Sequence, residues 1–527
     1  MTFAEIFRDT VFGKTIQFLS RNRLLRFPKE KEPSKLNTYV KNPHVLKREE
    51  SLTSDSDEDL ETYGLYSLMS QAPRSRSGRD PALIARTRTE DGGPLRIITW
   101  APDDSEFLVS SEIYLLAFSI DIGSAIYTPG IPDAVSHFGI STVAASLELT
   151  VFVLGYSLGP MILSSLSELP AIGRSPTYVV SLLIFVFLNF AVIYTSNLAM
   201  FPAFRFLAGF FGSPALATGG ASMGDICSPR IRDSMIAIWG AFVISAPVLG
   251  PLVGGFAVAA EGWTWTIWQL IWVSGVTIVL LFFLLSETYA PTILSHLAQR
   301  IRKITGDANC VAEAELEVRS ISSKNILFEA LIRPFQLSFL EPIILLLNLY
   351  IALIYGILYI RFEAFPIIFE EKHGFNPSQT GLTFLGKLIG TIALAISSYF
   401  YWKYTYQARM FDANGNITPE AQLPPACVGC ICLPISLFWF GWTGNFTSIH
   451  WLTPIITSGL LAIGGCLIFN NIFTYQAHAY PRYAAYVLAG NGFMRSSFGA
   501  GFPLLTTAMF HNLARVRMAS RFARHDI

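Results

Sequence analysis

The stretch Ala246-Pro-Val-Leu-Gly-Pro-Leu-Val-Gly-Gly255 sets two prolines and three glycines in a long apolar segment without a neighbouring charge. A helix of a soluble protein would break there, because proline removes a backbone hydrogen bond and clashes with the preceding turn. In a lipid bilayer, neighbouring helices can satisfy the freed backbone groups, and the glycines let another helix approach closely. The stretch therefore predicts a shaped helix interface inside a membrane bundle.

The composition independently indicates a membrane protein. Of 527 residues, 52% are hydrophobic and only 14% are charged, which is too apolar for one soluble core, and the chain lacks solenoid repeats. A spanning helix needs about 20 apolar residues to cross about 30 Å of hydrocarbon. Such windows fall near residues 110–132, 143–164, 177–195, 199–221, 235–258, 266–285, 342–361, 379–401, 425–443, 452–475 and 484–509. We expect an all-α polytopic membrane protein.

The distribution of Lys and Arg predicts the orientation. Basic residues gather in the loops that would share a side with the N-terminus, whereas the opposite loops hold little beyond Lys372 and Arg361. Because basic loops stay on the cytoplasmic side of a membrane, we expect a cytoplasmic N-terminus and a cytoplasmic central loop.

The polar parts of the chain divide it into five regions. The polar N-terminal stretch, with the acidic run Asp55-Ser-Asp-Glu-Asp-Leu-Glu61, cannot bury enough apolar surface to fold alone. We therefore predict a disordered cytoplasmic tail over 1–97, an N-terminal transmembrane half over 98–285, a central cytoplasmic loop over 286–340, a C-terminal transmembrane half over 341–513 and an atypical basic tail over 514–527.

Several motifs carry a family resemblance. The opening stretch, with Pro247, Gly250, Pro251, Gly254 and Gly255, resembles the antiporter motif in the fifth helix of drug:proton antiporters of the major facilitator superfamily. Further matches are Ile122-Gly-Ser-Ala-Ile-Tyr-Thr-Pro129, Pro160 through Arg174, Phe201 through Gly209, Glu287-Thr-Tyr-Ala-Pro291, Phe362-Glu-Ala-Phe-Pro366, Phe438-Trp-Phe-Gly-Trp442 and Ala489 through Ser497. Together they cover about residues 99–510. The chain resembles the fungal antiporters with twelve spans, particularly the branch that confers azole and benomyl resistance and includes toxin exporters such as cercosporin facilitators.

The resemblance implies two six-helix halves that rock around a central substrate site, with inward proton flow driving export. Arg205 matches the family's Arg-x-x-x-Gly signature, which the resemblance links to proton coupling, and a buried Arg in a span should face the bundle interior. The candidate proton-carrying carboxylates are Asp121, Glu148 and Glu363. Glu363 fits the family pattern better than the other two.

The loops after the second and fourth spans carry charges that can pair. Glu168, Gly173 and Arg174 lie on the first loop, and Asp225 and Arg232 on the second. The resemblance implies a cytoplasmic latch between conformations; the alternative is ordinary solvated loop charge.

A binding cavity for varied lipophilic compounds needs aromatic faces and a few polar groups within apolar spans. Trp439, Asn471 and Gln476 meet this description, as do our seven candidate cavity residues: Tyr127, Asn348, Tyr355, Phe365, Asn470, Asn491 and Arg495. The alternative for each is helix packing or anchoring at the membrane interface.

The chain departs from the family pattern in three places. Trp100-Ala-Pro-Asp-Asp104 resembles the family's entry motif, but the usual Asn-Pro-x-Asn-Trp continuation is absent. After Phe510, the sequence Ala514-Arg-Val-Arg-Met-Ala-Ser-Arg-Phe-Ala-Arg-His525 stands where relatives have a twelfth span, so we expect eleven spans with the twelfth missing. Lys387 stands in the eighth span where the resemblance leads us to expect an apolar residue.

The predicted function is proton-coupled export of a lipophilic drug, fungicide or self-made toxin across a fungal plasma membrane. The alternatives are proton-coupled uptake and a truncated remnant without activity. An intramembrane enzyme is disfavoured, because the eight histidines are isolated and no catalytic or metal-binding motif is present. We expect a monomer that needs no cofactor beyond the proton gradient, and no nucleic-acid partner.

Overall fold

The computed structural model describes residues 10–19, 40–41, 96–98, 106–167, 169–195, 200–227, 229–305, 310–312, 315, 332, 335–392, 397–406, 418–444, 446, 448–480 and 484–525. The chain divides into two compact units. The first comprises Met1–Gly13, Ser105–Thr288 and Ile326–Ile527, and the second comprises Lys14–Asp104 and Tyr289–Asn325.

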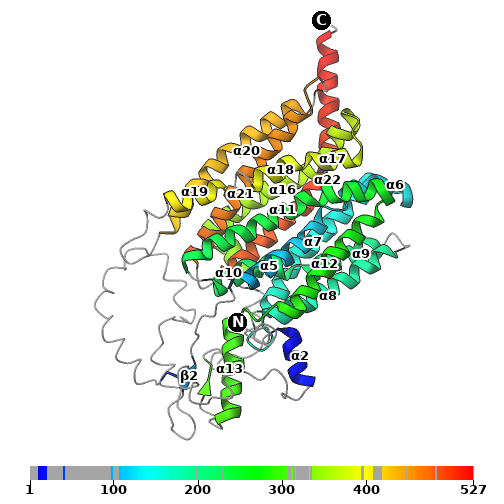
Figure 1. The fold of residues 1–527 in the computed structure, drawn as a ribbon. Helices are drawn as coiled ribbons and strands as arrows, with labels where there is room; N and C mark the ends of the chain where they lie inside the picture. Colours follow the sequence, from blue (N-terminus) through cyan, green and yellow to red (C-terminus); the bar gives the residue numbers. More distant parts are fainter. Residues whose placement is uncertain are drawn as a thin grey trace. The chain divides into compact units, whose positions relative to one another are not determined.

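The first unit is a bundle of long helices (Figure 1). Its first half contains α5 (Glu106–Asp121), η3 (Ile122–Ser124), η4 (Thr128–Gly130), α6 (Ile131–Phe138), α7 (Thr142–Ser167), α8 (Arg174–Ile193), α9 (Met200–Gly212), α10 (Pro214–Ile226), α11 (Pro229–Glu261) and α12 (Thr264–Leu284). Its second half contains α16 (Pro342–Pro366), η5 (Ile367–Lys372), α17 (Pro377–Thr383), α18 (Leu385–Ile389), α19 (Ser397–Thr405), η8 (Pro419–Gln422), α20 (Pro424–Thr443), α21 (Leu452–Ala479) and α22 (Ala484–His525).

Among the described residues, eight helical segments are long and apolar enough to cross a membrane. Of the eleven predicted windows, the fourth is divided into α9 and α10, and the eighth into α17, α18 and α19. Pro214 begins α10, where its missing N–H is tolerated. The polytopic all-helical architecture is confirmed, while eleven spans remain a prediction.

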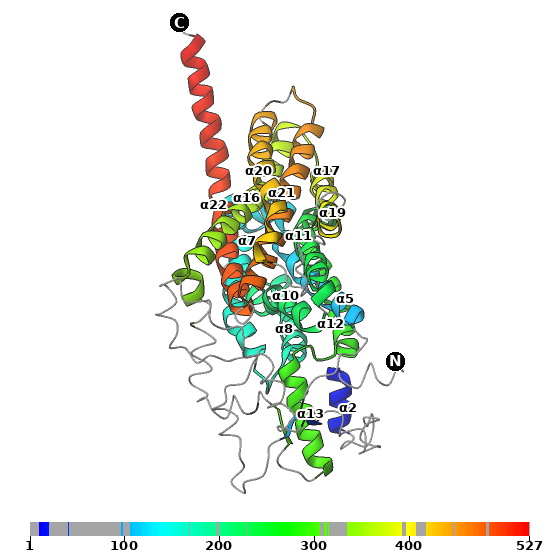
Figure 2. The same ribbon diagram turned by 90° about the vertical axis from the view of Figure 1, so that its left-hand side faces the viewer.

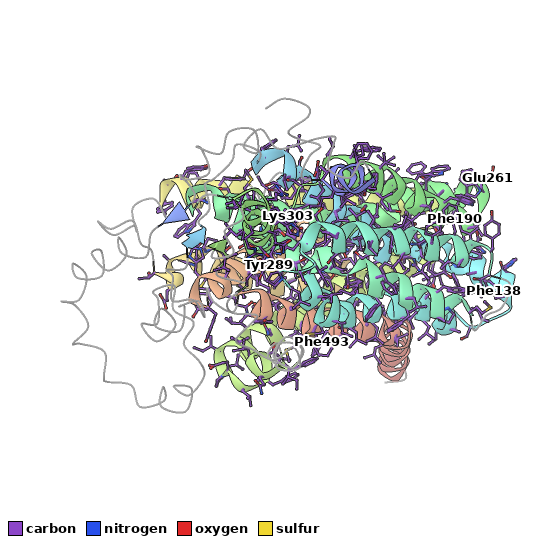
Figure 3. The ribbon with its side chains drawn as sticks, turned by 90° about the horizontal axis from the view of Figure 1, so that it is seen from below. Phe138, Phe190, Glu261, Tyr289, Lys303 and Phe493 are labelled. Atoms are coloured by element: carbon purple, nitrogen blue, oxygen red, sulfur yellow. The ribbon has the colours of Figure 1, made fainter. Side chains whose placement is uncertain are left out.

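Three crossings of the first half end on the same side of the bundle. Phe138, Phe190 and Glu261 lie at or near the last residues of α6, α8 and α11, and all three lie at one end of the bundle (Figure 3). The first, third and fifth predicted spans therefore run the same way. This is the arrangement that short loops between membrane helices require.

Two helix pairs make the most extensive contacts between the two halves. Helix α7 packs along α22, and α11 packs along α17. Across the first pair, the Thr150 hydroxyl donates to the Ala500 carbonyl at 3.0 Å, and the Ser157 hydroxyl donates to the Phe493 carbonyl at 3.0 Å. Side-chain hydroxyls thus satisfy backbone groups between helices where no water competes.

Helices form in parts of both terminal regions. Within the predicted disordered tail, α2 (Val11–Leu19) forms, because Phe12 packs on Phe282 and Phe283 with ring centroids 5.8 and 4.8 Å apart. Helix α22 continues across the predicted boundary at residue 513 to His525 (Figures 1 and 2). The basic residues there favour a helix as readily as the preceding ones, since Arg and Ala are strong helix formers.

The second unit contains α13 (Ala290–Thr305) and a sheet of β1 (Val40–Lys41), β2 (Arg96–Ile98) and β3 (Cys310–Val311). Strand β2 pairs antiparallel with β1 and parallel with β3. Arg302 on α13 binds both carboxylate oxygens of Glu315, at 2.6 and 2.9 Å. Burial raises the pKa of Glu315, but the hydrogen bonds from Arg302 and Ser295 outweigh it and hold the pKa below its ordinary value.

Candidate functional site

Three buried tyrosines meet where the two halves face each other. The Tyr156 hydroxyl on α7 lies 2.9 Å from the hydroxyls of both Tyr355 and Tyr359 on α16. Those two hydroxyls are 3.3 Å apart, and Tyr359 also donates to the Ser124 hydroxyl at 2.9 Å. We name these three residues the tyrosine triad. It joins α7 and η3 of the first half to α16 of the second.

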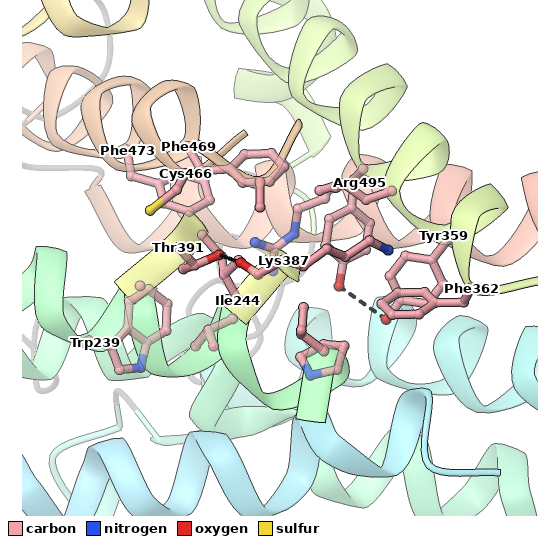
Figure 4. A pocket seen from close by; sticks show the side chains of 17 residues that line it. Trp239, Ile244, Tyr359, Phe362, Lys387, Thr391, Cys466, Phe469, Phe473 and Arg495 are labelled. Atoms are coloured by element: carbon pink, nitrogen blue, oxygen red, sulfur yellow. Dashed lines mark hydrogen bonds between the residues drawn. The ribbon is translucent and has the colours of Figure 1, made fainter. Parts of the chain in front are cut away.

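A narrow pocket lies beside the triad (Figure 4). The volume of this pocket is about 40 Å³, which is enough for a few waters, whereas pockets for drug-sized ligands measure about 300 Å³ or more. A ligand of that size therefore needs a conformation in which the halves separate. The lining consists of Trp239, Gly240, Val243, Ile244, Pro247, Val248, Tyr355, Leu358, Tyr359, Phe362, Lys387, Thr391, Ala462, Cys466, Phe469, Phe473 and Arg495.

Of the seven predicted cavity residues, the pocket lining includes Tyr355 and Arg495. The Arg495 guanidinium carbon lies 4.9 Å from the centroid of the Tyr355 ring and interacts electrostatically with Asp121. Asp121 is 1% exposed, and neither of its carboxylate oxygens has a hydrogen-bond partner among the described residues. Asp121 on the first half and Arg495 on the second thus attract each other across the bundle.

The other predicted cavity residues lie outside the pocket lining. Tyr127 packs edge-on against Phe201 and Trp263 in a separate aromatic cluster. Phe365 stacks on Phe384, with ring centroids 4.5 Å apart. The three amides Asn348, Gln476 and Asn491 bind one another instead, with Asn348 accepting from Gln476 at 2.8 Å and from Asn491 at 2.9 Å.

Asn470 on α21 also lies outside the pocket lining and packs against α11. Its side-chain oxygen lies where a Cβ on Gly240 would be, so glycine on α11 allows α21 to approach closely. Its amide nitrogen donates to the Cys466 sulfur at 3.5 Å.

The candidate proton-coupling residues lie at separate positions in the bundle. Arg205 on α9 is fully buried, and one of its terminal nitrogens donates to the Gly123 carbonyl at 3.1 Å. Its guanidinium carbon lies 4.6 Å from the centroid of the Phe152 ring, and Glu148 is its electrostatic partner. The two remaining guanidinium nitrogens, Nε and Nη1, have no hydrogen-bond partner within the described part of the chain. Arg205 and Glu148 therefore form one charged site inside the first half.

Glu363 lies apart from Arg205. It is 7% exposed on α16, and its carboxylate accepts a hydrogen bond from Ser146 on α7. This contact also joins the two halves. Its other oxygen, Oε1, lacks a partner among the described groups.

Two of the predicted latch residues, Arg174 and Asp225, form an ion pair. Arg174 Nη1 lies 2.8 Å from Asp225 Oδ2 and donates to the Ser222 hydroxyl at 3.1 Å. Gly173 has a φ of 82°, which only glycine adopts easily, and it begins the turn into α8. Glu168 lies outside the described residues, and the side chain of Arg232 is likewise outside them, although its backbone belongs to α11.

Glu287 adds a contact that the sequence prediction missed. Its carboxylate accepts hydrogen bonds from the backbone N–H of Arg174 at 2.9 Å and of Ser175 at 3.4 Å. These N–H groups belong to the first turn of α8, which favours an anion. Glu287 was named only as part of a motif; its position after an apolar span was the one available signal.

We expect Asp225→Ala to lower the stability of the protein by roughly 2 kcal/mol, between the values for exposed and buried ion pairs. Arg174 is 2% exposed and would lose its 2.8 Å contact with the Asp225 carboxylate. Thermal unfolding of the purified protein in detergent measures the change. Glu261→Gln, which removes an exposed carboxylate, is the control. Equal unfolding temperatures for the two variants would contradict a stabilising latch.

The antiporter motif lies in α11, where Pro247 and Pro251 interrupt the hydrogen-bond ladder. A Cβ on Gly250 would lie 2.8 Å from the Ile126 nitrogen, and one on Gly254 would overlap the Ile126 carbonyl oxygen. Gly255 faces the Pro377 carbonyl on α17. The motif therefore packs backbone against backbone on both the first crossing and the second half, and Pro247 also lines the pocket.

Comparisons with known proteins agree on the family. The chain is 34% identical over 531 residues to the cycloheximide resistance protein of Candida maltosa, covering 97% of this chain and 92% of that protein. It is 38% identical over 436 residues to multidrug transporter FLR1 of Candida glabrata, covering 82% of this chain and 77% of that protein. It is thus similar to fungal drug-resistance transporters.

The fold matches a solved transporter. The xylose transporter XylE from E. coli, in a partially occluded inward open conformation, superposes with a TM-score of 0.53 and 13% identity, covering 76% of this chain and 93% of that chain. The family model of the Major Facilitator Superfamily matches residues 113–503. A family of transporters rather than enzymes therefore accounts for the bundle, the pocket between its halves and the motifs, and this chain belongs to the Major Facilitator Superfamily.

Proposed function

We propose that this protein exports a lipophilic small molecule in exchange for protons. The observation that carries the proposal is the pocket between the halves, whose lining is mostly aromatic and aliphatic with a few polar groups. Such a lining suits varied apolar compounds, because extensive apolar contacts supply affinity and only a small number of polar groups restrict which compounds can bind. Similarity to a cycloheximide resistance protein and to a multidrug transporter supports drug-like substrates.

Proton coupling is proposed to use the buried charged groups. Arg205 with Glu148 in the first half, Asp121 facing Arg495, and Glu363 near the outer end of α16 are buried in the bundle. Ionisable groups at such depth are costly and are typically functional. Protonation of a carboxylate cancels its attraction to the opposing arginine, so proton uptake and release would alter the balance between conformations.

The proposed orientation of the protein in the membrane follows from the predicted cytoplasmic N-terminus. We propose a plasma-membrane location, a monomer, and the latch Arg174–Asp225 on the cytoplasmic side. The antiporter motif in α11 would then lie toward the outer surface, where it packs on α17.

The test is accumulation of the neutral fluorescent lipophile Nile red in a pump-deficient yeast that expresses this chain, with surface expression quantified. We expect lower intracellular accumulation than in cells with empty vector, and the difference should vanish when a protonophore is added. Increased, protonophore-sensitive accumulation would indicate uptake instead. Unchanged accumulation despite full surface expression would argue against export of this class of compound.

A further inference from the structure

Lys387 is a buried cation in the wall of the pocket. It lies on the short helix α18, is 1% exposed, and lines the pocket together with Arg495 (Figure 4). Its ammonium nitrogen lies 4.6 Å from the ring centroids of both Phe362 and Phe365 and 4.9 Å from that of Phe384. It has no hydrogen-bond partner among the described residues.

Among the described residues, no carboxylate interacts with Lys387. Arg361 on α16 is its electrostatic neighbour and has the same sign. Arg495 on α22 interacts with Asp121, so that carboxylate is already engaged. Within the part of the chain that the structure describes, Lys387 forms no ion pair. A buried, unpaired ammonium is strongly unfavourable unless an anion joins it or it loses its proton.

The phenylalanine rings favour the charged form. Ring faces carry a partial negative charge and attract cations, whereas a neutral amine gains little from them. Three rings around one ammonium therefore hold a cation and leave its hydrogen-bond donors unused. Among the described residues, this site therefore holds a cation but provides no hydrogen-bond acceptor for it.

The unused hydrogen-bonding atoms of the pocket lining point to the same chemistry. Three buried side-chain atoms of the lining have no partner among the described residues, namely Lys387 Nζ, Arg495 Nε and Trp239 Nε1, and each of them is a donor. The Trp239 nitrogen lies against Gly219 on α10, which leaves the two cationic side chains as the donors available to a ligand. The hydroxyls of Tyr355, Tyr359 and Thr391 already have partners. A ligand that completes this pocket supplies acceptors.

We propose that the transported compound is a lipophilic organic anion, an aromatic carboxylate or phenolate, whose anionic oxygen binds the Lys387 ammonium while its apolar body lies against the aromatic lining. This inference rests on the proposed function and specifies its substrate class. A charged oxygen in this position turns the buried ammonium into a charge-assisted, hydrogen-bonded pair. A neutral compound of the same shape leaves the ammonium unpaired.

The experiment compares two probes of equal shape, 2-naphthoate and 2-naphthamide, for binding to the purified full chain in detergent at pH 7. The acid is ionised there, because carboxyl groups have pKa values of about 4. We expect naphthoate to bind on the order of tenfold more tightly than the amide, which corresponds to about 1.4 kcal/mol for one charge-assisted bond. Lys387→Met should abolish the preference of the protein for naphthoate over the amide, and Lys387→Arg should retain it. Lys303→Met removes an exposed lysine as the control.

The outcomes separate this inference from the proposed function. Equal affinity of the wild-type chain for both probes, or no binding of naphthoate, overturns the anion site even if Nile red is exported. Loss of naphthoate binding in 100 mM chloride, taken as about physiological ionic strength, assigns Lys387 to a small inorganic anion and also overturns it. A tenfold preference for naphthoate that depends on Lys387 supports the anion site. If the same protein reaches the cell surface but does not export Nile red, that result contradicts the proposed transport and leaves the anion site supported.

Discussion

Arg205→Ala is expected to reduce proton-driven export to the background of cells with empty vector. Arg205 is fully buried, bonds to the Gly123 carbonyl and is the electrostatic partner of Glu148. Without it, Glu148 stays in the bundle with no opposite charge, which costs on the order of 3 kcal/mol unless the carboxyl is protonated. A carboxyl that is permanently protonated cannot exchange a proton with the transport cycle.

Two further variants distinguish coupling from folding. Arg205→Lys keeps the charge but cannot reach both the Gly123 carbonyl and the Phe152 face with a planar group, so we expect partial export. The double variant Arg205→Ala with Glu148→Gln removes both charges and should reach the cell surface without restoring export. Accumulation of Nile red with quantified surface protein measures all three. Normal export by Arg205→Ala would show that this arginine has only a packing role.

The second large effect is expected for Gly254→Val. The added Cβ would overlap the Ile126 carbonyl oxygen, which belongs to the backbone between η3 and η4 and cannot move aside like a side chain. The overlap forces α11 away from the first crossing, at a cost on the order of 3 kcal/mol or more. We expect little folded protein at the surface and a much lower unfolding temperature for whatever is purified.

A matched control exists for this substitution. Gly275 also lies within a long apolar helix, α12, and no atom lies within 4 Å of the position that its Cβ would occupy. Gly275→Val should therefore reach the surface at wild-type level. Equal surface levels of the two variants would mean that the close approach at Ile126 is not needed for folding.

Much of the fold could be predicted from the sequence, because uninterrupted apolar windows and basic loops are local signals. The pairing of Arg174 with Asp225 was also accessible, since both residues lie at helix ends next to short loops. Which side chains meet inside the bundle was less accessible. Lipid is as apolar as a protein core, so the faces of a membrane helix differ little in hydrophobicity and the pattern does not reveal its rotation.

Particular residues illustrate this limit. The sequence predicts Tyr355 as a cavity residue but does not reveal its partners Tyr156 and Tyr359. Tyr156 comes from the other half of the chain, so no local pattern connects it to the two tyrosines on α16. Tyr127 fulfils the same compositional criterion and lies in a different aromatic cluster. Lys387 could be identified as unusual from its neighbours in sequence, but its three aromatic contacts come from α16 and the turn before α18.

The tyrosine triad has a consequence for the speed of transport. In the Tyr156–Tyr355 and Tyr156–Tyr359 contacts either hydroxyl can donate, so the bonds can reverse direction by rotation of O–H groups alone. When the halves separate, Tyr355 and Tyr359 lose their hydrogen bonds to Tyr156, and Tyr359 loses its hydrogen bond to Ser124. A water molecule can replace each of these bonds at little cost. Water can therefore replace the hydrogen bonds that the triad makes between the two halves. Entry of water into the pocket lowers the barrier to separation of the halves.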